Sequence, residues 1–184
     1  YREMLKRDDI HGVVNVTSNT FHKEGTIASL EAGKHVLSEK PMALYVQNCK
    51  AMIDAADRNK KALQIGTQRR HVPAYVELVS RIRNGLIGNV LYAWVNAFRI
   101  DWLKLFADPG EDSKKNWRMS QELSGGIIYE QGIHTLDLFN WLIGSEPVKI
   151  SCIGGINNTL MQKRNSWDHA GVTVQYANNA VMTC

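Results

Sequence analysis

Two short groups of residues have the chemical types and spacing that proton transfer and charge stabilisation require. The first is Glu39-Lys40-Pro41, which ends an apolar run that begins at His35 and is typical of a short strand. A lysine at the carboxyl end of a parallel strand lies where open α/β sheets bind their ligands. Pro41 disfavours the helical conformation at Lys40 and fixes where the chain leaves the strand. Lys40 is therefore a candidate for ligand contact, and a solvated lysine at a turn is the alternative.

The second group lies on an expected helix from about Gly126 to Ile143. Four side chains share an arc of about 60° on this helix: Glu130, His134, Asp137 and Trp141. The opposite side carries Ile128, Thr135, Leu136, Phe139, Leu142 and Ile143. A histidine accepts a proton near neutral pH, and a carboxylate one turn away can orient it. Ser124-Gly125-Gly126 before the helix lets a ligand or another backbone approach closely. An acid/base site is one interpretation, and an exposed polar face is the other.

Other site chemistries have less support. Glu130 and His134 could be half of a metal site, but the other histidines form no HxxxH pattern and pair with no cysteine, so no metal is expected. A serine nucleophile lacks its GxSxG elbow. Three cysteines without CxxC spacing, Cys49, Cys152 and Cys184, favour reduced thiols over a disulfide framework.

Composition indicates an ordinary globular chain. Its 184 residues are 44% hydrophobic and 22% charged, which excludes disordered, collagenous and coiled-coil classes. No apolar run approaches the roughly 18 residues of a membrane span, so we expect no membrane partner. The net charge of +4 is scattered along the chain without a recognised motif, so we expect no nucleic-acid partner.

The elements that must position these residues fall into two parts. Strands are expected at Gly12–Thr17, His35–Glu39 and Ala62–Gly66, alternating with a helix from Phe21 to Ala32 and a second helix with Pro41 just inside its start. This alternation predicts parallel βαβ units, and hence part of a Rossmann-type, doubly wound sheet over residues 1–66.

After Gly66 the pattern changes to an α+β domain, residues 67–184, with an open and mostly antiparallel sheet. A helix is expected at Pro73–Asn84, and strands at Val148–Ile153, Val172–Tyr176 and Ala180–Thr183. A long strand at Asn89–Phe98 is apolar on both faces, so both faces are expected to be covered. A polar connection containing Asp108-Pro109-Gly110 follows it.

The sequence also resembles a known family. Asp9–His22 together with Leu30–Pro41 resembles the central signature of the Gfo/Idh/MocA oxidoreductases, the relatives of glucose-fructose oxidoreductase and inositol dehydrogenase. Ser124-Gly125-Gly126 with Glu130–Asp137 is similar to the family's second signature, and Gly144–Val148 to the stretch after it. A lone Glu-Lys-Pro is a weak motif, but two signatures in order on the expected elements are specific.

The resemblance implies an NAD(P)-binding Rossmann domain, a substrate domain whose sheet often mediates homo-oligomerisation, and a sugar or polyol substrate. The aromatic face of Tyr92, Trp94 and Phe98 fits such an interface. Lys40 matches the lysine that contacts the reacting hydroxyl and the nicotinamide, often beside a cis-proline bond, and His134 matches the acid/base. Glu130 stands where the family commonly has a substrate-contacting Asp. Expected cofactor contacts are Thr17, Asn19, His22, Glu39, Lys40, Gln68 and Arg70.

Two departures from the family pattern are visible. Ser18 replaces a frequent Pro, and Glu130 extends the usual carboxylate by one methylene, which could reshape the sugar pocket or mark a subgroup with other substrates. No GxGxxG is present, and the chain opens at Tyr1 inside an apparent helix and stops at Cys184 inside an apparent strand. We therefore expect a fragment whose phosphate-binding loop lies upstream of Tyr1, and the choice between NAD and NADP stays open.

The expected function is an NAD(P)-dependent dehydrogenase that acts on a secondary hydroxyl of a sugar, cyclitol or sugar derivative. Two alternatives remain: a glycosidase that uses NAD for transient oxidation, and a non-catalytic sugar or nucleotide sensor on the same fold. We expect a cytoplasmic location, and export stays open because the sequence lacks an initiator Met.

Overall fold

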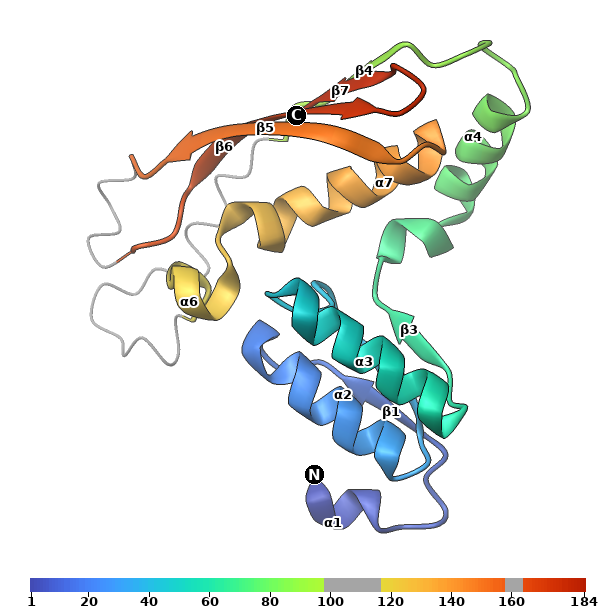
Figure 1. The fold of residues 1–184 in the computed structure, drawn as a ribbon, viewed down its shortest axis with the longest axis vertical. Coiled ribbons are helices and arrows are strands. Elements are labelled where there is room, and N and C mark those ends of the chain that lie inside the picture. Colours follow the sequence, from blue (N-terminus) through green and yellow to red (C-terminus); the bar gives the residue numbers. More distant parts are fainter. Residues whose placement is uncertain (98–116, 158–163) are drawn as a thin grey trace. The chain divides into compact units, whose positions relative to one another are not determined.

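The computed structural model describes residues 1–97, 117–157 and 164–184. It divides into two compact units, unit 1 from Tyr1 to Gly66 and unit 2 from Thr67 to Cys184 (Figure 1). The expected connection around Asp108-Pro109-Gly110 and the residue Phe98 lie outside the described residues.

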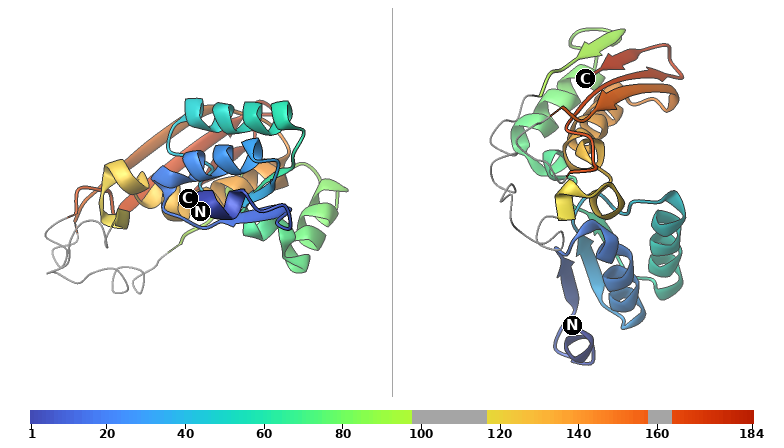
Figure 2. Two further views of the ribbon diagram at one scale, coloured as in Figure 1. Left: turned by 90° about the horizontal axis from the view of Figure 1, so that it is seen from below. Right: turned by 90° about the vertical axis from the view of Figure 1, so that its left-hand side faces the viewer.

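Unit 1 is a three-stranded parallel sheet with two helices packed together on one face (Figure 2). The elements in chain order are α1 (Arg2–Leu5), β1 (Gly12–Asn15), the 3₁₀ turn η1 (Asn19–Phe21), α2 (His22–Glu31), β2 (His35–Ser38), α3 (Val46–Asn59) and β3 (Leu63–Ile65). The strand order is β1-β2-β3, and both pairings are parallel. The predicted parallel βαβ arrangement is confirmed.

The core of unit 1 forms where the two helices meet the sheet. Leu30 of α2, Val36 of β2 and the alanines Ala55 and Ala56 of α3 are buried together. Two small alanines on one helical face let α3 pack closely against α2 and the sheet. Leu37, the neighbour of Val36 in β2, points to the opposite face and is exposed.

The helix expected to begin beside Pro41 begins later. α3 starts at Val46, and Tyr45 before it has an extended backbone, so Pro41 lies in a loop. Tyr45 and Val46 continue the apolar periodicity of the helix but are exposed. The apolar periodicity therefore made the predicted helix begin too early. The buried residues of α3 are Met52, Ala55 and Ala56.

Unit 2 is a helix packed on one face of a four-stranded sheet. The elements are the 3₁₀ turn η2 (Gln68–His71), α4 (Pro73–Arg83), β4 (Tyr92–Trp94), the 3₁₀ turn η3 (Trp117–Met119), α6 (Gln121–Ser124), the π-helical turn η4 (Ile128–Gly132), α7 (Ile133–Ile143), β5 (Pro147–Gly155), β6 (His169–Tyr176) and β7 (Val181–Thr183). The strand order is β4-β7-β6-β5. Strand β6 is antiparallel to β5 and β7, and β4 is parallel to β7, which confirms the mostly antiparallel sheet.

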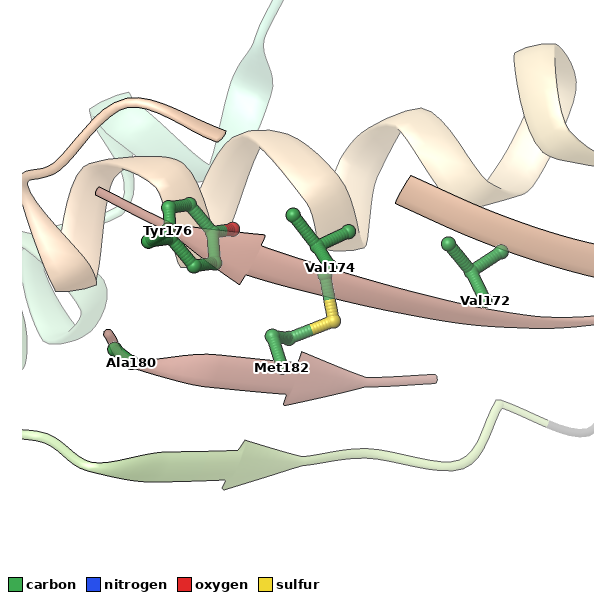
Figure 3. Packing of buried hydrophobic residues seen from close by; sticks show 5 residues of the cluster. All are labelled: Val172, Val174, Tyr176, Ala180 and Met182. Carbon is green, nitrogen blue, oxygen red and sulfur yellow. The ribbon is translucent and has the colours of Figure 1, made fainter. Parts of the chain in front are cut away.

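One face of this sheet makes the core of unit 2 (Figure 3). Its buried cluster is Val172, Val174, Tyr176, Ala180 and Met182. From α7, Leu136, Phe139 and Ile143 pack against this cluster, so the helix has the apolar back that its sequence predicted. The hydroxyl of Tyr176 donates a hydrogen bond to Oδ1 of Asn140, 2.8 Å away, which ties the strand to the same helix.

The prediction for the strand at Asn89–Phe98 is wrong in length and in burial. β4 covers only Tyr92–Trp94, and only Ala93 packs on the core. Tyr92 is 60% and Trp94 65% exposed. Among the described residues β4 is the edge strand and α7 lies on one face of the sheet, so alternation turns these aromatic residues to the other face. An apolar residue on each face of a strand does not by itself indicate two covered faces.

The core of unit 2 gives the first testable prediction. Met182 is fully buried in the cluster of Figure 3, so Met182→Ala removes buried methylenes and leaves a cavity. We expect it to lower the free energy of unfolding by about 2–5 kcal/mol. Val148→Ala, at a 62% exposed position of the same sheet, is the control and should change it by less than about 0.5 kcal/mol. Urea denaturation followed by circular dichroism measures both, and equal effects would contradict this core.

Candidate functional site

The carboxyl ends of the three strands of unit 1 lie at one edge of its sheet. The N–H of Glu39 donates to the carbonyl of Asn15 at 2.9 Å, and the N–H of Gly66 donates to the carbonyl of Ser38 at 2.8 Å, so the loops after β1, β2 and β3 begin side by side. A Cβ at Gly66 would lie 3.1 Å from the carboxyl group of Glu39. The absence of a side chain at Gly66 therefore leaves room for the Glu39 carboxylate at this edge.

Lys40 stands at the same edge, directly after Glu39. Its N–H donates to Oε2 of Glu39 at 3.0 Å, and the Lys40–Pro41 peptide bond is cis, as the resemblance implied. Lys40 is half-buried, so part of its side chain stays accessible.

Asn15 connects the loop after β1 to helix α2. Its buried side chain donates from Nδ2 to the carbonyl of His22 at 3.1 Å and to Oγ1 of Thr26 at 3.2 Å. Its Oδ1 accepts from the hydroxyl of Thr17 at 2.8 Å. Sequence reasoning missed this residue, although an asparagine in the apolar run Gly12–Val16 is the signal that could have found it.

His22 lies deeper than the resemblance implied. Its ring is 1% exposed, with Nδ1 2.7 Å from the carbonyl oxygen of Pro41 and Nε2 3.0 Å from that of Thr17. Both ring nitrogens thus face backbone carbonyls of the loops after β2 and β1. Of the other expected contacts in unit 1, Asn19 is also buried, whereas Thr17 is exposed.

In unit 2, Glu130 lies on a turn that is wound differently from the expected helix. The helix expected from about Gly126 to Ile143 is present, but its first part, η4, is π-helical and the α-helix α7 begins only at Ile133. A π-turn has i→i+5 hydrogen bonds, so it rotates side chains away from the directions of a single α-helix. The shared face expected for Glu130 and His134 on an uninterrupted α-helix therefore does not follow for this helix.

Arg118 is the charged partner of Glu130. The carboxylate of Glu130 is buried, and its Oε2 lies 3.2 Å from Nε of Arg118. The guanidinium of Arg118 stacks over the ring of Trp117, with its carbon 4.2 Å from the ring centroid. Arg118 thus places a positive charge beside the buried carboxylate of Glu130, which offsets part of the free-energy cost of burying it. Sequence reasoning did not find this arginine, because no motif includes it.

The glycine pair before η4 serves the packing of this unit. Gly125 and Gly126 have φ values of +79° and +78°. A Cβ on Gly125 would lie 2.6 Å from the ring of Tyr129, and a Cβ on Gly126 would lie 2.9 Å from Oε1 of Gln121. The space beside these two glycines is therefore occupied by side chains of the adjoining turns, Tyr129 and Gln121.

Two arginines of η2 hold the polar side of α7. Arg69 donates from Nη1 to the carbonyl oxygen of His134 at 3.1 Å. Arg70 forms a forked ion pair with Asp137, in which Nε lies 2.9 Å from Oδ2 and Nη2 lies 2.9 Å from Oδ1, and it also stacks over Trp141. The resemblance implied that Arg70 approaches a nicotinamide, whereas here its guanidinium is engaged by Asp137. His134 itself is half-buried, and Gln68 is exposed.

Neither metal ligation nor a membrane span is visible in the described parts of the chain. Residues 1–97, 117–157 and 164–184 contain no group of three or more His, Cys, Asp or Glu side chains that could hold a metal ion. Over the same residues no helix has both the length and the apolar composition to cross a bilayer. Burial raises the pKa of the free thiols of Cys49 and Cys184, which disfavours their nucleophilic thiolate form.

Comparisons with known proteins agree for both units. The model of the "GFO/IDH/MocA C-terminal domain" matches residues 75–184, and the model "Oxidoreductase family, NAD-binding Rossmann fold" matches residues 1–67.

Individual relatives match nearly the whole chain. The scyllo-inositol 2-dehydrogenase (NAD(+)) of Bacillus subtilis is 31% identical over 97% of this chain and 48% of its own length. The 2,7-anhydro-N-acetylneuraminate hydratase of Mediterraneibacter gnavus is 30% identical over 83% of this chain and 38% of its own length. The solved WlbA dehydrogenase from Bordetella pertussis, in complex with NADH and UDP-GlcNAcA, is similar with a TM-score of 0.84 at 25% identity, over 98% of this chain and 53% of that one. The chain thus spans about half or less of the length of these relatives.

The pair of Arg70 and Asp137 gives the second prediction. Their side chains are 38% and 18% exposed, and the forked geometry strengthens the pair, so a double-mutant cycle of Arg70→Ala and Asp137→Ala should give a coupling energy of about 1 kcal/mol. The exposed pair Arg81–Glu77 on α4 is the matched control, with an expected coupling of about 0.3–0.5 kcal/mol. Unfolding in urea measures both cycles. A coupling at Arg70 no larger than at Arg81 would show that the pair does not hold α7.

Proposed function

Because this chain belongs to the GFO/IDH/MocA family of NAD-binding oxidoreductases, as its two sequence signatures predicted, we propose that its protein transfers a hydride between a secondary hydroxyl group and NAD or NADP. The proposed substrate is a sugar, cyclitol or sugar derivative. The observation that carries the proposal is the presence of Lys40 at the carboxyl edge of the parallel sheet in a chain that also presents His134 on an anchored helix. Unit 1 would be part of the dinucleotide-binding domain and unit 2 part of the substrate domain.

The residues at the carboxyl edge of unit 1 fit a nicotinamide dinucleotide. Ligands of open α/β sheets bind beyond the carboxyl ends of the strands, and here the aligned loops bring Glu39, Lys40 and Thr17 to that edge. The carboxylate of Glu39, which lies beside Gly66, would accept hydrogen bonds from ribose hydroxyls. Other proposed neighbours of the cofactor are Asn19, Gln68 and Arg70. When bound, the nicotinamide supplies the hydride acceptor at its C4.

Three side chains would share the work at the reacting hydroxyl. In the proposed mechanism His134 accepts the hydroxyl proton, and the ammonium of Lys40 stabilises the negative charge that develops on the oxygen. Glu130 would contact the substrate or orient His134, and its ion pair with Arg118 holds its side chain in place. Arg69 supports the proposal because it fixes the backbone of His134.

Relatives support both the substrate class and one alternative. The B. subtilis relative acts on a cyclitol by name, and the relative in M. gnavus is named a hydratase of a sugar acid derivative. The hydration reaction in this name involves no net oxidation of the substrate. This favours keeping the NAD-dependent glycosidase, which would oxidise its substrate only transiently, as the second candidate.

Turnover by variants tests the proposed mechanism. Lys40→Met and His134→Ala should each lower kcat/KM by about 10²- to 10⁴-fold, because each removes charge or proton transfer at the reacting oxygen. Production of NADH or NADPH by the intact protein with a panel of polyols and sugars measures this, with Lys50→Met and His71→Ala at exposed positions as controls. Undiminished turnover in either variant would overturn the assigned role. Release of free sugar without net NADH would favour the glycosidase, and binding without turnover would favour a sensor.

We also propose that the uncovered face of the sheet in unit 2 binds a second copy of the protein. Trp94 on β4 and Ile153 on β5 lie on the face opposite the buried cluster, and both are exposed. Trp94→Glu would bury a charge in such an interface, so it should shift the protein toward monomer in analytical ultracentrifugation. Val46→Glu, at an exposed apolar residue of unit 1, is the control. A wild-type monomer, or an unchanged oligomer in Trp94→Glu, would contradict the proposal.

A further inference from the structure

The ring of His22 joins two loops at the edge of the sheet where Lys40 lies. His22 is the first residue of α2 and is buried. Its Nδ1 lies 2.7 Å from the carbonyl oxygen of Pro41, the residue bonded to Lys40, and its Nε2 lies 3.0 Å from the carbonyl oxygen of Thr17. A carbonyl oxygen only accepts hydrogen bonds, and a neutral imidazole carries one N–H, so such a ring donates to one of the two carbonyls. The shorter contact is that of Nδ1 with Pro41. One side chain thus links the loops after β1 and β2.

The position of this ring is fixed by its own surroundings. The carbonyl oxygen of His22 accepts a hydrogen bond from Nδ2 of Asn15, whose side chain is buried at the end of β1. The backbone carbonyl of Asn15 in turn accepts from the N–H of Glu39 in the loop after β2. The imidazole therefore projects from a residue that is anchored to the strand ends, so it can hold the Pro41 carbonyl in place.

We propose that His22 is a positioning residue for Lys40, acting through the carbonyl of Pro41. The backbone of Lys40 is held on both sides: its N–H by the carboxylate of Glu39, and the carbonyl after it by Nδ1 of His22. This constraint fixes the direction in which the lysine side chain leaves the loop. The proposal rests on the function proposed above, in which the ammonium of Lys40 acts at the reacting oxygen.

A positioning role accounts for the burial of His22 better than direct contact with a cofactor. With a ring that is 1% exposed and two nitrogens facing carbonyls, His22 offers a ligand almost no surface. A displacement of about 1 Å of a reacting group can lower turnover by about 100-fold, because the orientation of the groups contributes much of the rate. The effect of His22 should therefore appear in kcat, while the affinity for the nucleotide changes little.

Two amide substitutions separate the two bonds of the ring. The amide nitrogen of Asn is as many bonds from Cβ as Nδ1 of histidine, so His22→Asn keeps a donor toward Pro41. The amide nitrogen of Gln matches Nε2 in the same way, so His22→Gln keeps a donor toward Thr17. Each variant removes the aromatic ring and one of its two buried contacts, so each is the matched control for the other in stability.

The experiment compares both variants in the intact protein. We expect His22→Asn to keep kcat within about threefold of the wild type, because the bond to Pro41 remains. We expect His22→Gln to lose about 10- to 100-fold in kcat, with the KM for the nucleotide nearly unchanged. Hydrogen exchange of the backbone amides over residues 39–45, measured by mass spectrometry, should be faster in His22→Gln and unchanged in His22→Asn.

Each remaining outcome overturns the proposal. Equal losses of kcat, no loss in either variant, or a loss confined to the KM for the nucleotide would mean that His22 does not act through Pro41. Failure of either variant to fold would make His22 a residue of the folding core instead. If the wild type shows no dehydrogenase activity, the proposed function fails separately, and hydrogen exchange over residues 39–45 still decides whether His22 fixes the loop.

Discussion

Parallel pairing of three short strands is the constraint on which the candidate chemistry of unit 1 depends. Parallel strands end at one edge of their sheet, so residues separated by a whole helix in sequence begin their loops side by side. The bonds from Glu39 to Asn15 and from Gly66 to Ser38 align these ends. The loops that carry Thr17 and Lys40 are then close enough for one buried imidazole to contact both.

In unit 2, contacts on two sides of the helix α7 fix its position. The apolar residues of α7 are buried against strands β6 and β7, while Arg69 and Arg70 contact its other side at His134 and Asp137. A helix fixed by packing alone can slide or rotate where its neighbours permit. Directional hydrogen bonds and a forked ion pair add the orientation that apolar contacts lack, and the helix end at Gly144, with φ of +65°, sets where the chain turns into β5.

Local patterns predicted the elements well, and contacts distant in sequence less well. The strands around Val13, Val36 and Val174 and the helix end at Gly144 follow from periodicity and turn residues. The pair of Arg70 and Asp137 joins residues 67 positions apart, and no local pattern encodes it. The π-turn at Glu130 was likewise not predicted, since apolar periodicity does not distinguish a π-turn from an α-helical turn. The contacts of the buried His22 could not be predicted from the sequence either, since a motif shows which residue is present and not what it contacts.

The parallel pairing of β4 with β7 sets an order of assembly for the nascent chain. Tyr92 pairs with Val181 and Trp94 with Thr183, so β4 pairs with a strand that is synthesised only after β5 and β6. The two strand pairings described in unit 1, β1 with β2 and β2 with β3, involve no residue after Ile65. Because domains generally fold as units from the amino end during synthesis, the loops that hold Lys40 can form before the sheet of unit 2 exists. Until β7 has been made, β4 with its exposed Tyr92 and Trp94 lacks its pairing strand.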